Sequence, residues 1–381
     1  FRPNRFRAEI SLFPLVGLFG FAFDVKMLQN ENKYVNSSLN NNMKKAYKYR
    51  GGIGVFDQEG QSIFERDVNT LVNNQIYLPT VDLLNDPTEG FYNDSDITSL
   101  LDVFKDYSQN VKKQYAEFLE KLTQKGVYSL SNNINNELLW AYYGSGHTGF
   151  AIEYDIDMLK KSLNHNQYFQ FIYDFDVDYK KSIPNADISI LSGKNKDVTP
   201  VLKVFLGTKS LSWKHEEEYR LIVEEKGLFD IDYRAVTGIY FGCRMRDSEI
   251  NFIMEKLKGR DLRYYKMRLV EQMYKFQPES IDDKYVDAPK YHANELTYDI
   301  DELLLPEDIL GKEAYAYKDR LVEALEIVKH EPLINKIYIA NISIESGNPI
   351  LIIWAYTNTK APPTKEFRFG LNEKGELQRI N

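Results

Sequence analysis

The stretch GVYSLSNNINNELLWAYYGSGHTGFAIEYD, residues 126–155, contains the features that decide the fold. Two strand-like runs, Gly126–Leu130 and Gly149–Tyr154, flank a polar turn, an apolar segment with a tryptophan, and a glycine-punctuated loop with one histidine. Short apolar runs bounded by turn residues are typical of buried strands. We therefore take these two strands as the centre around which the main domain is built.

Predicted strands and helices follow one another irregularly on both sides of this stretch. Strands are predicted at Lys45–Tyr49, Glu218–Glu224 and Val236–Phe241, whereas Ile97–Lys125 has the apolar spacing of one long helix or two. This order is not a regular β-α-β alternation, which argues against a parallel doubly wound sheet. We predict an α+β fold with a mixed, mainly antiparallel sheet and flanking helices.

Composition and periodicity divide the chain of 381 residues into four parts. Residues 1–42 form a leader, 43–270 the main α+β domain, 271–311 a charged, tyrosine-rich linker or arm, and 312–381 a small accessory domain. In the accessory domain, one helix candidate over Lys312–Lys329 precedes several strand-like runs that are joined by turn residues. This order predicts a helix followed by a β-meander.

The leader contains an apolar run, Leu12–Phe23, which follows three arginines. The run is shorter than the roughly 20 residues that a membrane-spanning helix needs. No small-residue cleavage site of a signal peptide follows it. Three interpretations stay open: a non-native or disordered extension before a natural start at Met43, which we favour, a buried N-terminal hairpin, or a membrane anchor.

The composition is that of a soluble globular protein, with 43% hydrophobic residues, 27% charged residues and a formal net charge of -8. This acidic balance argues against a broad nucleic-acid-binding face, which requires a basic surface. The single cysteine, Cys243, excludes an intrachain disulfide and a cysteine metal cluster. The histidines lack ligand spacing, so no metal is predicted. A reducing cytoplasm fits this cysteine usage.

Two polar spots in the first half of the main domain are candidates for ligand binding. Arg50 ends a predicted strand beside glycines, where a guanidinium either holds a phosphate or carboxylate, or closes a surface salt bridge. The turn with Asn85, Asp86 and Glu89 either binds a ligand or cation, or has Asx-turn chemistry with a solvated glutamate.

A third polar spot is WKHEEEYR, Trp213–Arg220, in which three carboxylates precede an alternating strand. On a strand, Glu216 and Glu218 share one face. A carboxylate at the start of a strand can hydrogen-bond a ribose hydroxyl or stabilise an oxocarbenium-like centre. The alternative is a solvated edge at which Arg220 is paired in a salt bridge.

Three further candidates come from the first stretch. Trp140 is either a core residue or a stacking platform, and Tyr143 lies three residues after it. His147 lies in the loop GSGHTG, which either approaches a ligand closely or holds a structural or exposed histidine.

A series of short motifs runs through the main domain: Tyr47–Arg50, Ile76–Leu78, Asn85–Gly90, Tyr128–Ser131, Asn136–Trp140, Tyr143, His147–Phe150, Ile152–Tyr154, Trp213, Glu216–Arg220 and Ile239–Gly242. Taken in this order, these motifs resemble the bacterial domain of unknown function 2971 family over about residues 47–269. The chain departs from the family at three positions, since the family commonly has a histidine where Tyr142 stands, a phenylalanine where Leu84 stands, and a tryptophan where Tyr219 stands.

The family layout is similar to that of ADP-ribosyltransferase-like folds, with an early strand that ends in arginine and a late strand that opens with glutamate. This resemblance implies that Arg50 would grip the pyrophosphate of NAD. It also implies that Tyr143 or Trp140 would stack on nicotinamide. Glu218 would hydrogen-bond the ribose and stabilise the oxocarbenium ion.

Two functions from different classes follow. The first is an NAD-using ADP-ribosyltransferase-like enzyme or NAD glycohydrolase in defence or toxin biology, with NAD as its substrate. The second is a non-catalytic module that binds a nucleotide or protein partner through the same polar groove. In both, the C-terminal unit is expected to recruit a partner or to oligomerise. The catalytic candidates are Glu218, Tyr143 and His147, and the ligand-binding candidates are Arg50, Asn85, Asp86, Glu89, Trp140, Trp213 and Arg220.

Overall fold

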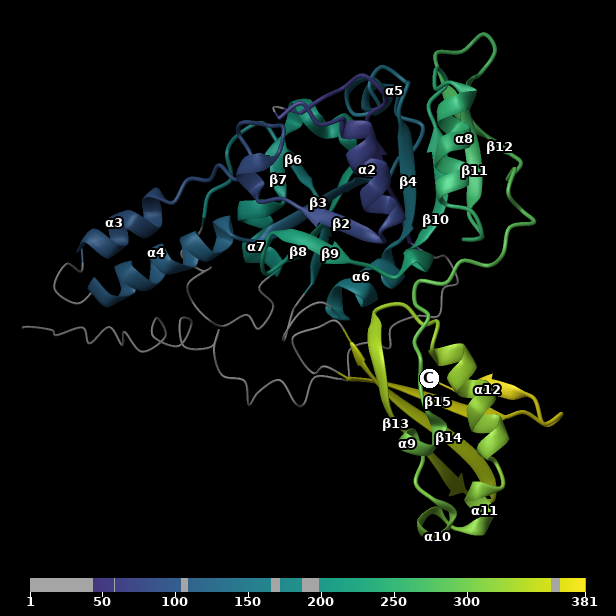
Figure 1. Cartoon of the computed structure of the whole chain (residues 1–381). Coiled ribbons are helices and arrows are strands. Elements are labelled where there is room, and N and C mark those ends of the chain that lie inside the picture. The colour runs from purple at the N-terminus through teal and green to yellow at the C-terminus, as the bar shows by residue number, and fades with distance from the viewer. Residues whose placement is uncertain are drawn as a thin grey trace, which may run out of the picture. The chain divides into compact units, whose positions relative to one another are not determined.

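The computed structural model of the protein describes residues 44–57, 59–103, 109–165, 172–186, 199–357 and 364–380 (Figure 1). The leader predicted for residues 1–42 lies outside these ranges. The chain divides into unit 1, with Leu78–Ser129 and Tyr173–Gly227, and unit 2, with Met43–Tyr77, Leu130–Ile172 and Leu228–Asn381. Among the described residues, no helix combines the length and the apolar character needed to cross a membrane.

The largest sheet contains eight strands in the order β12-β11-β10-β4-β1-β3-β8-β5. Strand β10 pairs with β11 in parallel, whereas β1 with β3, β1 with β4, β4 with β10, β5 with β8 and β11 with β12 are antiparallel. The predicted α+β class with a mixed, mainly antiparallel sheet is therefore confirmed. The strand bounds are β1 Lys45–Arg50, β3 Gly126–Ser131, β4 Phe150–Asp155, β5 Tyr173–Asp176, β8 Glu218–Val223, β10 Val236–Phe241, β11 Arg263–Leu269 and β12 Phe276–Ile281.

Two short strand pairs and the helices complete the main part of the chain. Strand β2 (Gln75–Leu78) forms a sheet with β9 (Gly227–Asp230), and β6 (Asp178–Lys180) runs parallel to β7 (Thr208–Ser210). The helices are α2 Ile63–Val72, α3 Ser95–Val103, α4 Gln109–Thr123, α5 Glu137–Tyr142, α6 Ile156–His165, α7 Thr199–Leu206 and α8 Asp247–Lys256, with 3-10 helices η3 Val81–Leu83, η5 Leu211–Glu216 and η6 Tyr233–Ala235.

The stretch at 126–155 supplies β3 and β4, the two strands that flank β1 in the sheet. Two of its glycines stand where a side chain has no room. A Cβ at Gly126 would lie 2.7 Å from the carbonyl oxygen of Glu225, and one at Gly149 would lie 2.1 Å from the carbonyl oxygen of Arg50. Close backbone approach therefore requires glycine at the start of β3 and just before β4.

In unit 2, strand alternation directs side chains to two covered faces. On one face, Phe150 packs edge-on against Phe64 of α2, and Phe64 also contacts Phe252 of α8. On the other face, Trp140 of α5 packs at 5.1 Å from the ring of Tyr49. At these positions the sheet is thus covered by α2 and α8 on one face and by the short helix α5 on the other.

Unit 1 has a separate core beneath α3, α4 and α7. Buried side chains from these helices pack with residues of the strands of unit 1, among them Tyr115 of α4, Phe205 of α7 and Ile222 of β8. The sequence left one or two helices open over Ile97–Lys125, and the structure has two, α3 and α4.

The stretch predicted as a linker or arm contains a strand, β12, which pairs with β11 from Tyr264↔Ile281 to Leu269↔Phe276. Alternation did not reveal β12 because none of its residues is buried. Phe276, Pro278 and Ile281 of this edge strand are only half-buried, and a proline within a short run weakens its strand pattern.

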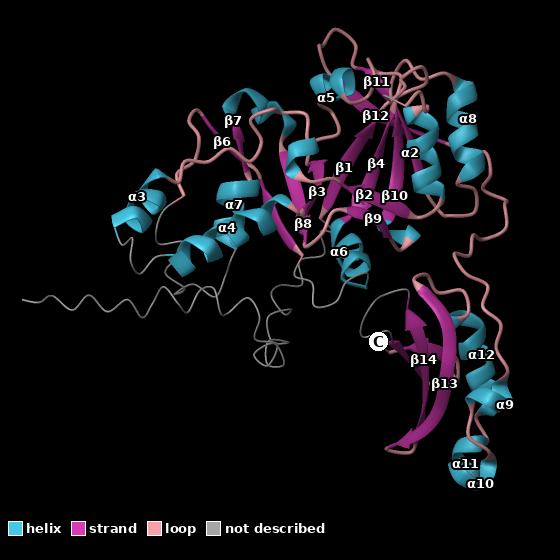
Figure 2. Cartoon of the chain, turned by 60° about the vertical axis from the view of Figure 1, so that its left-hand side comes forward, coloured by secondary structure: helices cyan, strands magenta, loops and turns pink. Residues whose placement is uncertain are grey.

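The C-terminal part of unit 2 has its own hydrophobic core. Four consecutive antiparallel strands form the predicted meander, with the helices on one side of β13 and β14 (Figure 2). Ser346 and Gly347 have φ of 52° and 79°, as a two-residue hairpin turn requires. The elements are α9 Ile300–Leu303, α10 Glu307–Leu310, α11 Lys312–Tyr315, α12 Lys318–Val328, β13 Ile334–Glu345, β14 Asn348–Thr357, β15 Thr364–Leu371 and β16 Leu377–Arg379.

Removing a central side chain of this C-terminal core will destabilise it strongly. Phe367 is 0% exposed, so Phe367→Ala should lower the free energy of unfolding by about 3–5 kcal/mol. Ile339 lies on the same small sheet and is 39% exposed, so Ile339→Ala should cost about 1 kcal/mol or less. Urea unfolding of both variants measures the difference, and equal effects would contradict the assigned core.

Candidate functional site

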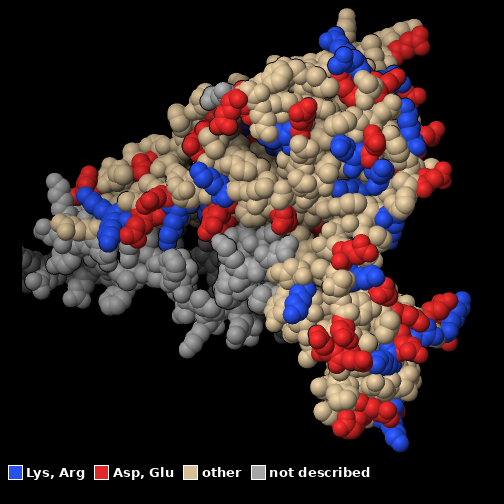
Figure 3. All heavy atoms as spheres, in the orientation of Figure 1, with Lys and Arg blue, Asp and Glu red and all other residues tan. Residues whose placement is uncertain are grey.

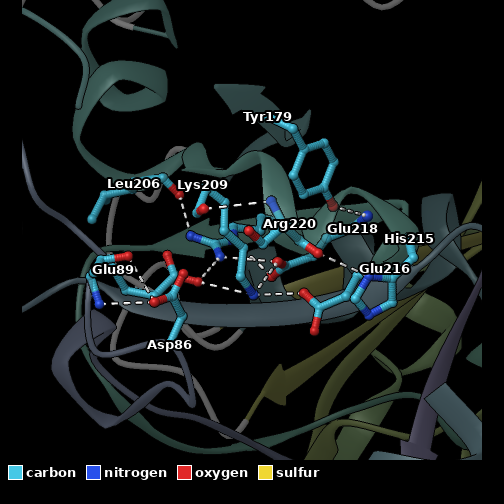
Figure 4. A network of polar contacts seen from close by, with 12 residues as sticks. Asp86, Glu89, Tyr179, Leu206, Lys209, His215, Glu216, Glu218 and Arg220 are labelled. Atoms are coloured by element: carbon cyan, nitrogen blue, oxygen red, sulfur yellow. Dashed lines mark hydrogen bonds and ion pairs between the residues drawn. The ribbon is translucent and has the colours of Figure 1, made fainter. Parts of the chain in front are cut away.

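Five charged side chains of unit 1 meet in one buried group, which we call the ion cluster: Glu89, Lys209, Glu216, Glu218 and Arg220 (Figure 4). They come from four places in the chain. Glu89 lies in the loop after η3, Lys209 lies in β7, and Glu216 ends η5. Glu218 and Arg220 lie two residues apart on β8 and therefore share a face of that strand.

Arg220 lies at the centre of the cluster and is 0% exposed. Its Nε donates to Oε1 of Glu218 at 2.8 Å, and its Nη2 donates to Glu89 at 2.7 Å and to Oε2 of Glu218 at 3.0 Å. Its Nη1 donates to the carbonyl oxygen of Leu206 at 2.7 Å. A buried guanidinium is tolerated only when its charge and its N–H groups are matched in this way.

Lys209 joins the three carboxylates of the cluster. Its Nζ lies 2.6 Å from Glu216, 3.2 Å from Glu89 and 3.4 Å from Glu218. The same ammonium group lies 4.9 Å from the centre of the Trp213 ring, which is a cation–π contact. One lysine therefore connects the buried charges to a partly exposed aromatic side chain.

The sequence predicted the salt bridge of Arg220 correctly, but it did not predict the backbone conformation just before β8. Glu216 does not lie on the strand with Glu218, because Glu217 is left-handed with φ of 44° and ends η5. The two carboxylates nevertheless meet at Lys209. The solvated edge considered above is wrong, because both side chains are buried, whereas the salt bridge of Arg220 is present.

The pKa values of Glu218 and Lys209 in the ion cluster are shifted strongly. Burial alone would raise the pKa of Glu218, but Arg220 and then Lys209 outweigh burial and lower that pKa to about 2. Burial would lower the pKa of Lys209, but the three glutamates outweigh it and raise that pKa. At neutral pH the cluster thus holds a carboxylate and an ammonium group that are poorly suited to general acid–base catalysis.

Three aromatic side chains of unit 1 lie next to the ion cluster, and we call them the aromatic rim: Tyr179, Trp213 and His215. The Tyr179 hydroxyl accepts a hydrogen bond from the backbone N–H of Glu218 at 2.8 Å. The rings of Trp213 and His215 lie 6.1 Å apart. All three side chains are partly exposed.

The predicted turn at Asn85–Glu89 supports the cluster through its backbone. The side chain of Asp86 accepts from the N–H of Thr88 at 2.9 Å and from its hydroxyl at 2.7 Å, which is the predicted Asx-turn chemistry. The backbone of Asp86 also accepts from the N–H of Glu89 at 3.0 Å. Asn85 is exposed. The turn thereby positions Glu89. This glutamate is buried, so the alternative that expected a solvated glutamate is wrong.

The other four predicted residues belong to unit 2. Arg50 lies 3.8 Å from Asp67, and Trp140 is fully buried with its Nε1 donating to the carbonyl oxygen of Ile134. Tyr143 caps α5 and packs against the Trp140 core. His147 is left-handed with φ of 69°, its ring lies 4.9 Å from Phe276, and burial followed by Arg244 lowers its pKa. The structure therefore places Arg50, Trp140, Tyr143 and His147 in unit 2. The six other predicted residues belong to unit 1, namely Asn85, Asp86, Glu89, Trp213, Glu218 and Arg220.

Unit 2 has its own buried carboxylate, Glu153 of β4, which is 1% exposed. Its Oε1 accepts from Thr237 and Arg263, both at 2.7 Å, and its Oε2 accepts from Tyr240 at 2.7 Å. Lys45 of β1 adds an ion pair at 3.1 Å. Glu153 thereby joins β4 to β1, β10 and β11.

Sequence reasoning missed Lys209, Tyr179 and His215 as members of the site. Tyr179 lies on β6 and Lys209 on β7, and these strands of three residues are too short to show a hydrophobic period. One signal did exist, because the three glutamates beside one arginine in WKHEEEYR need a further cation when they are buried. Within the described residues, no group of histidine, cysteine or carboxylate side chains is arranged to hold a metal ion.

Removing the charge of Arg220 from the ion cluster will lower the free energy of unfolding much more than removing one partner of an exposed ion pair. Arg220→Met leaves Glu89 and Glu218 buried beside a single lysine, so the free energy of unfolding should fall by about 3–5 kcal/mol. The matched control is Arg268→Met, which breaks the exposed pair with Glu279 at 2.8 Å and should cost about 0–1 kcal/mol. Similar losses in urea unfolding would show that the cluster is not a structural centre.

Stability should also fall in acid because of Glu218. Its pKa is about 2 in the folded protein, against about 4.3 in an unfolded chain. Because the folded pKa is the lower one, its contribution is fully present above pH about 4.3 and is lost as the pH falls toward 2. Over that window the free energy of unfolding should fall less steeply in Glu218→Gln than in the wild type. Parallel slopes would contradict the assignment.

Comparison with known proteins supports the family for one segment of the chain. No curated protein and no solved structure matches the chain. Residues 139–221 match the model of the family described as "Protein of unknown function (DUF2971)". This segment runs from α5 to β8 and contains Trp140, Tyr143, Trp213, Glu218 and Arg220. The predicted resemblance is thus confirmed as a match of the segment 139–221 to the DUF2971 family.

Proposed function

We propose that this protein is a non-catalytic module that binds a nucleotide at the aromatic rim. The observation that carries the proposal is that cations hold both oxygens of Glu218, Arg220 at 2.8 and 3.0 Å and Lys209 at 3.4 Å. A catalytic carboxylate has to contact the reacting sugar, and such contact would here replace charge-assisted bonds. Because these bonds occupy the carboxylate of Glu218, we infer that the ion cluster supports the aromatic rim and does not itself react with a ligand.

The chemistry of the rim suits a nucleotide. Aromatic side chains stack on nucleobases, whichever base is present. The rim is flanked along the chain by three exposed lysines, Lys180, Lys181 and Lys214, and ammonium groups of this kind can pair with phosphates. The cation–π contact with the buried Lys209 limits the freedom of Trp213, and a preorganised side chain loses less entropy when a ligand binds.

NAD cleavage, in an ADP-ribosyltransferase-like or NAD glycohydrolase reaction, is the second candidate. It is favoured by the pKa of Glu218 of about 2, because stabilisation of an oxocarbenium ion requires an ionised carboxylate. In this case Glu218 is catalytic and NAD is the substrate. A role in defence or toxin biology, a cytoplasmic location and partner recruitment by the C-terminal unit stay predictions.

Trp213→Ala is the direct test of the rim. Loss of one stacked base costs about 1–3 kcal/mol, so the affinity for NAD, ADP or ATP should fall by about 5- to 150-fold. Calorimetric titration of the purified full chain measures this change. The matched control is Tyr142→Ala, which removes an aromatic side chain that is 62% exposed on α5 and should leave the affinity unchanged.

Nicotinamide release separates the two candidates in the same preparations. The binding module predicts saturable binding without release from NAD, in the wild type and in Glu218→Gln. Release by the wild type that is lost in a folded Glu218→Gln variant would overturn the binding module in favour of the enzyme. An unchanged affinity in Trp213→Ala would remove the rim from either site.

A further inference from the structure

The turn that joins β11 to β12 exposes large apolar side chains in unit 2. Leu269 is 61% exposed, Met273 58% and Tyr274 101%. The turn lies at the end of the β11–β12 hairpin, near the top of Figure 1. Leu269 is the last residue of β11, and Met273 and Tyr274 lie in the turn that follows. Exposed apolar side chains scattered singly need no explanation, whereas a contiguous apolar patch is typical of an interaction site.

This turn is well defined by hydrogen bonds. The N–H of Val270 donates to the carbonyl oxygen of Lys275 at 2.8 Å. The N–H of Met273 donates to the carbonyl oxygen of Val270 at 3.1 Å. Gln272 is left-handed with φ of 59°, which closes the turn. Tyr274 is therefore presented on a preformed support, which lowers the entropic cost of inserting it into a partner.

Unit 1 contains an apolar cavity of about 180 Å³ that suits such a side chain. Val81, Tyr92, Leu119, Leu122 and Phe205 line most of it. Tyr92 and Phe205 meet edge to face with ring centres 4.5 Å apart. An apolar protein cavity of about 150 Å³ holds a benzene molecule, so this one has room for a single aromatic ring.

The charges beside the turn and the cavity are complementary. Lys275 follows Tyr274 directly and is exposed. Glu120 lines the cavity, and Glu117, one turn earlier on α4, is also exposed. Over the face drawn in Figure 3, Lys and Arg are interspersed with Asp and Glu, so this face carries no broad charge of one sign. Local pairs of this kind fix the orientation of an interface more than its strength.

We propose that two copies of this chain associate head to tail, with Tyr274 of one copy inserted into the apolar cavity of the next. The partner is a second copy because the chain carries both the exposed ring and a cavity of matching size and charge. A contact between two different surfaces leaves a free Tyr274 at one end and a free cavity at the other. Association therefore continues into a ring or chain of copies.

Sedimentation velocity of the full chain over a range of concentrations tests the proposal. The wild type should show a sedimentation coefficient that rises with concentration. Tyr274→Ala and Leu119→Trp, which fills the cavity, should each remain monomeric. An equimolar mixture of the two variants should form a dimer, because one keeps an intact cavity and the other keeps an intact Tyr274.

Two controls keep the outcome interpretable. Ile309→Ala changes an apolar side chain of α10 that is 65% exposed and should associate like the wild type. If Leu119→Trp does not fold, Thr123→Trp obstructs the cavity from an exposed position of α4. A wild type that stays monomeric, a cavity variant that associates normally, or a mixture that forms no dimer would each overturn the proposal.

Discussion

The burial of Arg220 is the constraint on which unit 1 depends. A guanidinium with no exposed surface requires acceptors on several sides, and here they come from Glu218 on its own strand, Leu206 at the end of α7, and Glu89 in a distant loop. Replacing a buried ion pair by apolar residues is often neutral, whereas removing one partner is costly. The cluster therefore contributes less to net stability than to specifying which segments meet.

The ion pairs of the buried cluster also position side chains of the aromatic rim. Glu218 fixes Lys209, and Lys209 contacts the ring of Trp213. The N–H of Glu218 also donates to the hydroxyl of Tyr179. Two of the three rim side chains thus take their positions from groups that are themselves buried and ion-paired. A rim supported in this way changes little when it binds a ligand, because its rotamers are already restricted.

The sequence predicted those elements whose own residues carry a period or a turn signal. Strands β1, β4, β8 and β10 and the C-terminal meander were foreseen from alternation and from turns such as Ser346–Gly347. Strand β12 was missed because none of its residues is fully buried. The pairing of Glu89 with Arg220 joins residues 131 positions apart. No local pattern encodes such a contact, so the sequence offered both residues only as separate candidates.

Two of the buried carboxylates of this chain, Glu153 and Glu218, show why a shifted pKa alone does not identify a catalytic group. Glu153 and Glu218 both have a lowered pKa, and both accept hydrogen bonds on each oxygen. Glu153 joins four strands through a threonine, a tyrosine and two cations, which accounts for its chemistry as a structural contact. Glu218 differs in its surroundings, because a partly exposed tryptophan, histidine and tyrosine lie next to its cluster. Structural ion networks perturb pKa values as active sites do, so it is the adjoining aromatic surface, and not the pKa, that directs the search for a ligand to unit 1.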